Sequence, residues 1–282
     1  MNNLSKTFRY VNADGGELVF EYDHGFLINK PVGIDTVQVS LSQAQGINQV
    51  GATVQSTNVQ PRPVTISGRL VGEFQAENKN KLLSVIRPDL DAKLYADDYY
   101  INVHPTATPT IEPRPSFALF QFSLLAPYPY WQKDENTAAV LSGIEYKFRL
   151  PVNLSKTYAF GSAFQTQFIN VPNRGQLPVP FTVTFAARGA VTNPRITNAI
   201  TGEFLLLNKT LEAGERVVVE ITHKKTNVIS SVDGDVRGAL SLSTNLYRLA
   251  VGDNVLKPSA DTGGDQMEVS IDFATEIVGI AL

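Results

Sequence analysis

Apolar and polar residues alternate with a period of two along most of the chain. Phe181, Val183 and Phe185 alternate with threonine and alanine, and residues 267–273 place Met, Val, Ile and Phe between Glu, Ser and Asp. A period of two is that of a β-strand with one face in the core and one in solvent. The pattern therefore predicts strands in both segments.

Similar runs recur throughout the sequence and are separated by polar turn residues. They cover residues 17–22, 62–72, 97–103, 116–125, 145–150, 202–208 and 215–224. Turn chemistry follows or precedes them at Asp14-Gly15-Gly16, Ala213-Gly214-Glu215 and Asp233-Gly234-Asp235. Many short strands joined by such turns predict a mainly β protein built of sandwiches or barrels.

One segment, residues 75–89, has a helical pattern instead. Leu82, Leu83 and Ile86 follow i, i+1, i+4 spacing, and Pro88 ends the run. We expect a single amphipathic helix of about three turns, with these three residues on one side.

Prolines mark two loops and a domain boundary. The loop at residues 104–115 is long enough to protrude as an arm or a β-hairpin, and a second Pro-rich loop spans residues 170–180. Pro127 and Pro129 end the strand at 116–125, and the polar stretch after them is typical of a linker. With 282 residues, the chain predicts two domains, residues 1–135 and 136–282.

Composition excludes several classes of function. A net charge of -3 offers no basic stripe for nucleic acid, and no apolar run is long enough to span a membrane. The absence of cysteine excludes disulfides and thiolate metal sites. The first ten residues lack the features of a secretory signal, so we expect the chain to be made and to fold in a cytoplasm.

The search for chemistry assigns no catalytic, binding or metal residue and no cofactor. His24, His104 and His223 lie far apart in the sequence, without metal-binding spacing. Residues 233–238 resemble the start of an EF-hand loop, but Thr244 stands where a bidentate glutamate is needed, so a tight turn is favoured. Asp97-Asp98 are interpreted as turn residues before a strand. The glycosylation patterns at residues 3–5, 153–155 and 208–210 are interpreted as chance matches.

The aromatic cluster of Tyr128, Tyr130 and Trp131 leaves two interpretations open. Aromatic rings could form a platform that stacks on sugars or bases. The flanking prolines favour the other interpretation, a hydrophobic plug where two domains or two subunits meet.

Taken in order, these segments resemble a known family. Residues 62–72, the helix "ENKNKLLSVIRPD", "AKLYADDYYINV" and "FALFQFSLLAPYPYW" are similar to the N-terminal part of the distal tail proteins of long non-contractile-tailed phages. Residues 178–236 followed by "NLYRLAVGDNVL" resemble the C-terminal domain of that family. Nearly the whole chain takes part in the resemblance.

The resemblance implies a fold, an assembly and a location. It implies an N-terminal β-sandwich with one helix that closes into a homo-oligomeric ring of six subunits, and a C-terminal sandwich similar to galectins and carbohydrate-binding modules. The ring would be the hub between the tail tube protein and the tail-tip, tail-associated, baseplate or receptor-binding proteins, at the distal end of the tail of a virion. Such a protein would be assembled in the host cytoplasm or encoded by a prophage.

Two other functions stay open beside this non-enzymatic structural role. One is a carbohydrate-binding adhesin that recognises host cell-wall polysaccharide through its C-terminal domain. The absence of tryptophan after residue 142 speaks against sugar stacking there. The other is a glycoside hydrolase, which needs two close carboxylates in a groove.

Overall fold

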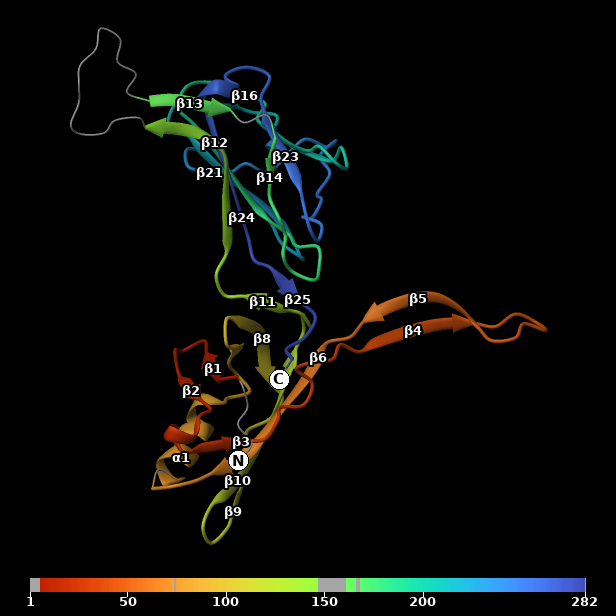
Figure 1. Cartoon of the computed structure of the whole chain (residues 1–282), viewed down its shortest axis with the longest axis vertical. Coiled ribbons are helices and arrows are strands. Elements are labelled where there is room, and N and C mark those ends of the chain that lie inside the picture. Colours follow the sequence, from red (N-terminus) through yellow and green to blue (C-terminus); the bar gives the residue numbers. More distant parts are fainter. Residues whose placement is uncertain (1–5, 74, 147–160, 166–167, 282) are drawn as a thin grey trace. The chain divides into compact units, whose positions relative to one another are not determined.

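The computed structural model describes residues 6–73, 75–146, 161–165 and 168–281 and divides the chain into two compact units (Figure 1). Unit 1 consists of Met1–Asp134 together with Glu276–Leu282, and unit 2 of Glu135–Thr275. The sequence analysis placed residues 276–282 in the second domain, whereas in the structure they return to unit 1. Both units are mainly β, as the alternating pattern predicts.

Unit 1 is built around a ten-stranded sheet whose main path runs β2-β1-β7-β8-β10-β6-β3. Strand β9 pairs with β10, and β11 joins β8 to β25. The strands of this sheet are β1 (Phe8–Asn12), β2 (Glu17–Val19), β3 (Phe26–Ile28), β6 (Arg62–Leu70), β7 (Ala92–Ala96), β8 (Tyr99–Pro105), β9 (Thr110–Pro113), β10 (Ala118–Ala126), β11 (Trp131–Lys133) and β25 (Glu276–Ile277).

The core of unit 1 confirms the strand prediction for residues 116–125. In β10 the side chains of Ala118, Phe120, Phe122 and Leu124 are buried, and they alternate with less buried residues. The strand ends at Ala126, immediately before Pro127, because proline cannot continue the ladder of a central strand. The three aromatic rings Phe20, Phe120 and Phe122 stack on one another inside this core.

The helix of unit 1, α1 (Gln75–Val85), has the predicted length of three turns. Its buried side differs in one residue from the prediction, because Leu83 is 47% exposed while Leu82 and Ile86 are buried. Asn78 lies on the buried side instead, four residues before Leu82. Its side-chain amide donates a hydrogen bond of 2.8 Å to the carbonyl oxygen of His24, which explains how a polar group is accommodated there.

The loop at residues 104–115 is partly a strand in the structure. Residues 104–105 end β8, and β9 pairs antiparallel with β10 over residues 110–113. The β-hairpin alternative of the sequence analysis is therefore the one that the structure contains. A much longer hairpin, which the sequence analysis did not identify, is formed by β4 (Val39–Ala44) and β5 (Thr53–Val59).

Unit 2 is a sandwich of a seven-stranded and a four-stranded sheet, with two more strands in a separate pair. The seven-stranded sheet runs β13-β12-β24-β15-β20-β21-β22, the four-stranded sheet runs β14-β23-β17-β18, and β16 pairs with β19. The strands are β12 (Thr137–Tyr146), β13 (Gly161–Gln165), β14 (Ile169–Asn170), β15 (Thr182–Ala187), β16 (Val191–Thr192), β17 (Arg195–Asn198), β18 (Phe204–Leu206), β19 (Thr210–Leu211), β20 (Arg216–Ile221), β21 (Thr226–Ser230), β22 (Gly234–Asp235), β23 (Val255–Ser259) and β24 (Met267–Phe273).

The core of unit 2 lies between its two larger sheets. Val183 and Phe185 of β15 and the alternate residues of β24 are buried, as the period of two predicts. Ile196 of β17 and Leu256 of β23 belong to the same hydrophobic cluster. The strand predicted at 145–150 is described for its first two residues, which end β12, and its other residues lie outside the described part of the chain.

Three short 3-10 helices complete the described structure: η1 (Tyr22–His24), η2 (Arg237–Ala239) and η3 (Gly264–Gln266). None of the helices in the described part of the chain has the length and apolarity needed to traverse a bilayer.

Candidate assembly surface and its buried anchor

The β4-β5 hairpin extends away from the other strands of unit 1 (Figure 1). Its two strands form a sheet of their own, and every residue from 38 to 59 is exposed. An isolated two-stranded hairpin is only marginally stable in water, because it has no third layer on which to bury apolar side chains. Among the described residues, therefore, nothing covers the apolar side chains of the hairpin.

The hairpin is amphipathic but uncharged. The register pairs Val39 with Val59 and Leu41 with Thr57, and after a bulge it pairs Gln43 with Val54. Val39, Leu41, Val54 and Val59 therefore share one face, and each is 46–51% exposed. Serine and asparagine side chains occupy the other face.

The lack of charge in this segment is unusual for an exposed edge. The 26 residues from Thr36 to Pro61 contain no Asp, Glu, Lys or Arg, although 18% of the chain is charged. Soluble proteins commonly protect exposed strand edges with charges, especially lysine, because an open edge pairs readily with another chain. The hairpin lacks this protection over its whole length, so its composition suits a strand pair that another molecule covers.

A buried arginine holds the base of the hairpin. Arg62, the first residue of β6, is 1% exposed. Its Nε donates to the carbonyl oxygen of Pro129 at 2.6 Å, and one terminal nitrogen donates to those of Gly33 at 3.0 Å and Ile34 at 2.8 Å. The other terminal nitrogen donates to the carbonyl oxygen of Val278. One side chain thus joins the segments before and after the hairpin to β10–β11 and the C-terminal segment.

The environment of Arg62 explains why arginine is suited to this position. Burial lowers the pKa of the guanidinium, while the nearby Asp35 and Tyr130 act in the opposite direction. Five N–H donors in a fixed plane allow a guanidinium to serve several carbonyl groups at once, which an ammonium group cannot do in the same geometry.

Close backbone packing at two glycines also fixes the chain at the base of the hairpin. Gly33 has a φ of +87°, and a Cβ added there would lie 2.0 Å from the carbonyl oxygen of Pro63. A Cβ at Gly279 would lie 2.4 Å from the carbonyl oxygen of Asp35. Both contacts require glycine, so the chain is held tightly on each side of the arginine.

The aromatic cluster belongs to this anchor. Trp131 is completely buried, and its Nε1 donates to the carbonyl oxygen of Ile34 at 3.1 Å. A buried indole cannot stack on a sugar, so the platform interpretation is wrong for Trp131. The ring fills the core of unit 1, whereas the sequence analysis placed the plug where two domains or two subunits meet.

Glu276 of the C-terminal segment connects to the same cluster and was not found by sequence reasoning. Tyr128 donates its hydroxyl to one oxygen of this buried carboxylate at 2.6 Å, and Gln132 donates to the other at 3.1 Å. Trp131 pairs with Ile277 in the β11-β25 ladder. No sequence spacing could have paired residues so far apart, because the contact depends on the chain returning after the whole of unit 2.

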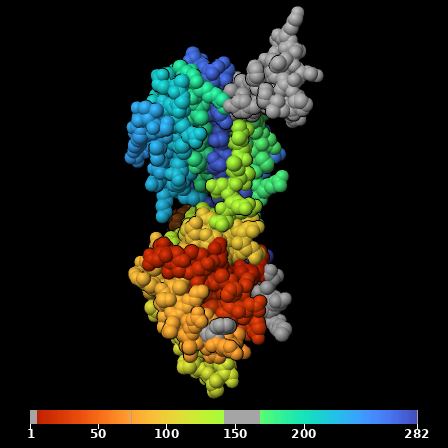
Figure 2. All heavy atoms as spheres, turned by 90° about the vertical axis from the view of Figure 1, so that its left-hand side faces the viewer, coloured from red at the N-terminus to blue at the C-terminus, as the bar shows by residue number. Residues whose placement is uncertain are grey.

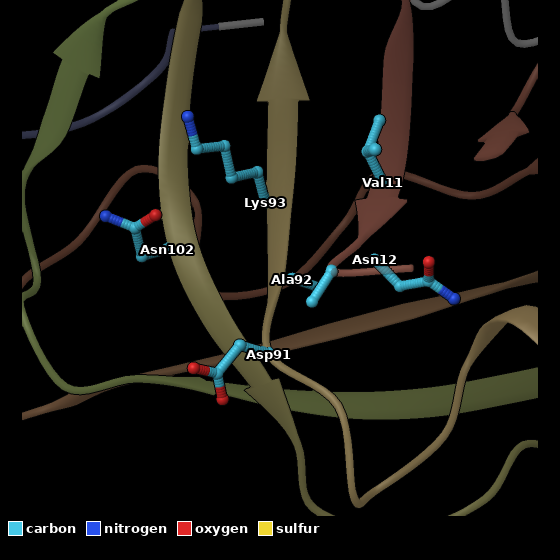
Figure 3. Close-up of a pocket in the computed structure, with 7 residues that line it drawn as sticks. Val11, Asn12, Asp91, Ala92, Lys93 and Asn102 are labelled. Atoms are coloured by element: carbon cyan, nitrogen blue, oxygen red, sulfur yellow. The ribbon is translucent and has the colours of Figure 1, made fainter. Parts of the chain in front are cut away.

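A shallow hollow lies on the outer side of β1, β7 and β8 and is lined by Val11, Lys93 and Asn102, among others. Figure 3 shows Lys93 and Asn102 pointing to one side, whereas Asn12 points the other way. The buried Asn12 amide is already used, since it donates to the carbonyl oxygen of Val85 at 2.9 Å. The hollow holds about 220 Å³, less than the roughly 300–1,000 Å³ of small-molecule sites.

The surface near this hollow is covered by stacked pairs of its own side chains. The guanidinium of Arg9 lies 4.0 Å from the ring centre of Tyr95, and the ammonium of Lys93 lies 4.2 Å from that of Tyr100. In Figure 2 the red surface of the N-terminal strands lies beside the orange surface of residues that follow the hairpin. These rings are occupied by cations of the same face and offer no open aromatic platform.

The residues singled out from the sequence do not converge in the structure. His24 lies 3.5 Å from a Glu21 oxygen and His104 lies 2.8 Å from an Asp91 oxygen, both in unit 1, while His223 belongs to unit 2. Within the described residues, no group of three or more histidines and carboxylates has the arrangement of a metal site. The sequons at residues 3–5 and 153–155 lie outside the described part of the chain.

Two of the predicted turns are confirmed. Asp97, with a φ of +50°, lies in the turn between β7 and β8 and accepts a hydrogen bond from the backbone N–H of Thr7. Asp233 lies in the turn between β21 and β22 and precedes Gly234, the first residue of β22, which has a φ of +71°. Asp233 also accepts a hydrogen bond from the Lys209 ammonium at 2.8 Å.

A buried carboxylate organises the turns of unit 2. Glu215 accepts a hydrogen bond of 2.6 Å from Ser230 and one of 3.1 Å from the backbone N–H of Glu212, and it lies 3.1 Å from the Lys209 ammonium. Burial acts to raise the pKa of Glu215, but these donors outweigh it, and the pKa is lower than its ordinary value of 4.5. The carboxylate is therefore a charged structural group.

Comparisons with known proteins agree with this fold. Residues 174–276 match the family model described as siphovirus-type tail component, C-terminal domain. No curated protein matches the sequence. The crystal structure of the Dit (gp 19.1) protein of SPP1, described as a paradigm of the hub adsorption apparatus in phages that infect Gram-positive bacteria, is similar with a TM-score of 0.71 and 11% identity. The match covers 95% of this chain and 98% of that one.

A chain in the baseplate of phage P2, in its activated conformation with Ca, matches with a TM-score of 0.50 and 9% identity over 98% of this chain and all of that one. At such identities the structural matches show the fold, and the family model adds the relationship in sequence. The resemblance to distal tail proteins is thereby confirmed: residues 174–276 match the siphovirus-type tail component model, and the chain has a fold similar to that of SPP1 Dit.

Proposed function

We propose that this protein is a structural hub at the distal end of a phage tail, where copies of unit 1 close into a ring of six. The β4-β5 hairpin is the observation that carries the proposal. It exposes an uncharged apolar face, and its base is fixed by Arg62 and two tightly packed glycines. An arm that is anchored at its base and exposes an apolar face in the described structure is suited to lie on a neighbouring copy.

The proposed ring supplies a cover for every arm. In a closed ring each copy gives its hairpin to one neighbour and receives the hairpin of the other, so no apolar face stays exposed. The description of SPP1 Dit as part of a hub adsorption apparatus supports the same role. We further propose that the ring joins the tail tube protein to tail-tip, baseplate or receptor-binding proteins and performs no catalysis.

The experiment measures the mass of the purified chain by light scattering and native mass spectrometry, with negative-stain images of the same sample. The test variant carries Leu41→Lys and Val54→Lys on the apolar face of the hairpin. The matched control carries Ser40→Lys and Ser56→Lys on the opposite face, where the two positions are diagonal neighbours as Leu41 and Val54 are. Both variants add the same charge to the same strands.

We expect six-membered rings for the wild type and the serine control, and monomers for the Leu41 and Val54 variant, because lysine cannot be buried without a partner. Wild-type monomers at every concentration would overturn assembly by this chain alone. Rings formed equally by both variants would show that the apolar face of the hairpin is not the contact.

The C-terminal sandwich is proposed to project from the ring as a galectin-like module. The alternative function, an adhesin that binds host cell-wall polysaccharide, would reside in this module. Its direct test is a pull-down of the full chain with isolated cell walls, and an absence of binding would remove this alternative.

A further inference from the structure

The four-stranded sheet of unit 2 is a cationic surface without acidic residues. Its strands β14, β23, β17 and β18 contain 14 residues, of which Arg195 and Lys257 are charged and none is Asp or Glu. The inner face of the sheet packs Ile196, Leu205 and Leu256 into the core. The outer face therefore carries two positive charges and no compensating charge of its own.

Arg195 is held by stacking and has no ion-pair partner among the described residues. Its guanidinium carbon lies 3.9 Å from the ring centre of Phe204 on the adjacent strand β18. Its Nε is buried without a hydrogen-bond acceptor in the described structure. Stacking on an aromatic ring fixes the plane of a guanidinium and leaves donors at its edge for an oxyanion.

Lys257 lies on the same face at a distance suited to a shared ligand. The register pairs Arg195 with Ser259 and Thr197 with Lys257. Arg195 and Lys257 are thus diagonal neighbours on one face, and the Cβ atoms of such neighbours lie slightly less than about 7–8 Å apart. The Lys257 ammonium lies 5.5 Å from the ring centre of Phe168, which is 49% exposed.

The acidic residues beside this sheet are occupied by neutral donors. Glu203 accepts a hydrogen bond from the Thr201 hydroxyl at 2.8 Å. Asp253 accepts one from the side chain of Asn170 at 2.8 Å, and Asp261 accepts one from that of Asn193 at 2.7 Å. Within the described residues none of the three forms an ion pair with Arg195 or Lys257, so both cations remain available.

We propose that this face, defined by Arg195, Lys257, Phe204 and Phe168, binds a polysaccharide that carries phosphate, sulfate or carboxylate groups. The face of a sheet offers side chains, while the backbone groups point along the plane of the sheet, so an extended peptide would instead bind at an edge. Here the cations are flanked by the hydroxyls of Thr197 and Ser259, which suit the hydroxyl groups of sugars. This site lies outside the hairpin and does not depend on ring formation.

The test measures binding to the full chain by isothermal titration calorimetry at low salt. The probes are dextran sulfate, neutral dextran of the same length, and poly-L-glutamate as an acidic peptide. The variants are Arg195→Gln and Lys257→Gln. The matched controls, Arg216→Gln and Lys224→Gln, remove the same charges from exposed residues of β20 and of the turn that follows it, on the other sheet.

We expect dextran sulfate to bind and neutral dextran not to bind. Each test variant is expected to weaken the binding of dextran sulfate at least about fivefold, because it removes a charge-assisted contact. The controls are expected to change binding less than twofold. Equal losses for tests and controls would overturn the site in favour of diffuse attraction. Tighter binding of poly-L-glutamate, with the same dependence on Arg195 and Lys257, would assign the face to an acidic protein segment instead. Since Lys257 is exposed, its variant decides the matter even where Arg195→Gln fails to fold.

Discussion

Replacing Arg62 with methionine is expected to destabilise unit 1 by about 2–4 kcal/mol. The change removes the donors that the carbonyl groups of Gly33 and Pro129 use, and an unsatisfied buried acceptor costs about 1–3 kcal/mol. Methionine also removes the cost of burying a charge, which offsets part of the loss from the unsatisfied acceptors. The expected net loss is therefore about 2–4 kcal/mol and not the full sum over the acceptors. Apolar replacements of buried ion pairs are often neutral because both partners are removed. Here the acceptors belong to the backbone and remain.

The assay is urea unfolding of the full chain, followed by tryptophan fluorescence. Trp131 is the only tryptophan and lies in unit 1, beside the arginine, so its emission reports this unit alone. The matched control is Arg69→Met on the same strand, where the exposed side chain lies over the ring of Phe117. That control is expected to cost less than about 1 kcal/mol.

A stability of the Arg62 variant within about 0.5 kcal/mol of the wild type would refute the reasoning, as would an equal loss in the control. A loss of about 2–4 kcal/mol, with an unchanged m value (the slope of the unfolding free energy against urea concentration), would support it. The same samples test whether the anchor supports the proposed assembly, since the proposed rings should dissociate at a lower urea concentration when the base of the hairpin is loosened.

Three further outcomes are expected. Gly33→Ala should lower the melting temperature strongly, because its Cβ would lie 2.0 Å from a carbonyl oxygen. The control Gly51→Ala has a similar φ but open space around it, so it should lower the melting temperature less, at a cost in stability of only about 1–2 kcal/mol. Equal shifts in melting temperature would contradict the close contact at Gly33. Trp131→Ala should cost about 3–5 kcal/mol in unfolding followed by circular dichroism, and an unchanged curve would contradict its burial. Glu215 has a lowered pKa, so its stabilisation is complete above the ordinary value of 4.5 and is lost as the pH falls through the lower folded pKa. Calorimetry of Glu215→Gln should therefore show a smaller loss of stability of unit 2 in acid, and an identical loss would exclude this role.

The alternating pattern was sufficient for much of the fold. Residues 118–124 and 267–273 have the predicted buried faces because a strand between core and solvent imposes that alternation directly. The helix was predicted because it also has one face in the core and one in solvent. Leu83 was misplaced because two adjacent residues cannot both lie at the centre of one helix face.

The hairpin was overlooked because its exposed strands have no core to enforce a pattern. Its signal lay elsewhere, in the complete lack of charge between Asp35 and Arg62, two charged residues that flank the hairpin. The anchor around Arg62 could not be predicted from the sequence, for a different reason. In the described structure the side chain of Arg62 donates its hydrogen bonds to backbone carbonyl groups, which leave no mark in the sequence, and these acceptors come from segments up to 216 residues away.

The return of Glu276–Leu282 to unit 1 sets an order on synthesis. Unit 2 is encoded between the two parts of unit 1, so its residues leave the ribosome before β25 can join β11. At about 5–20 residues per second, the first part of unit 1 waits roughly 7–28 s for its last strand. The anchor of the hairpin, which needs the carbonyl group of Val278, is therefore completed only after unit 2 has been made. The hairpin therefore has its complete anchor only on a chain that has been translated past unit 2.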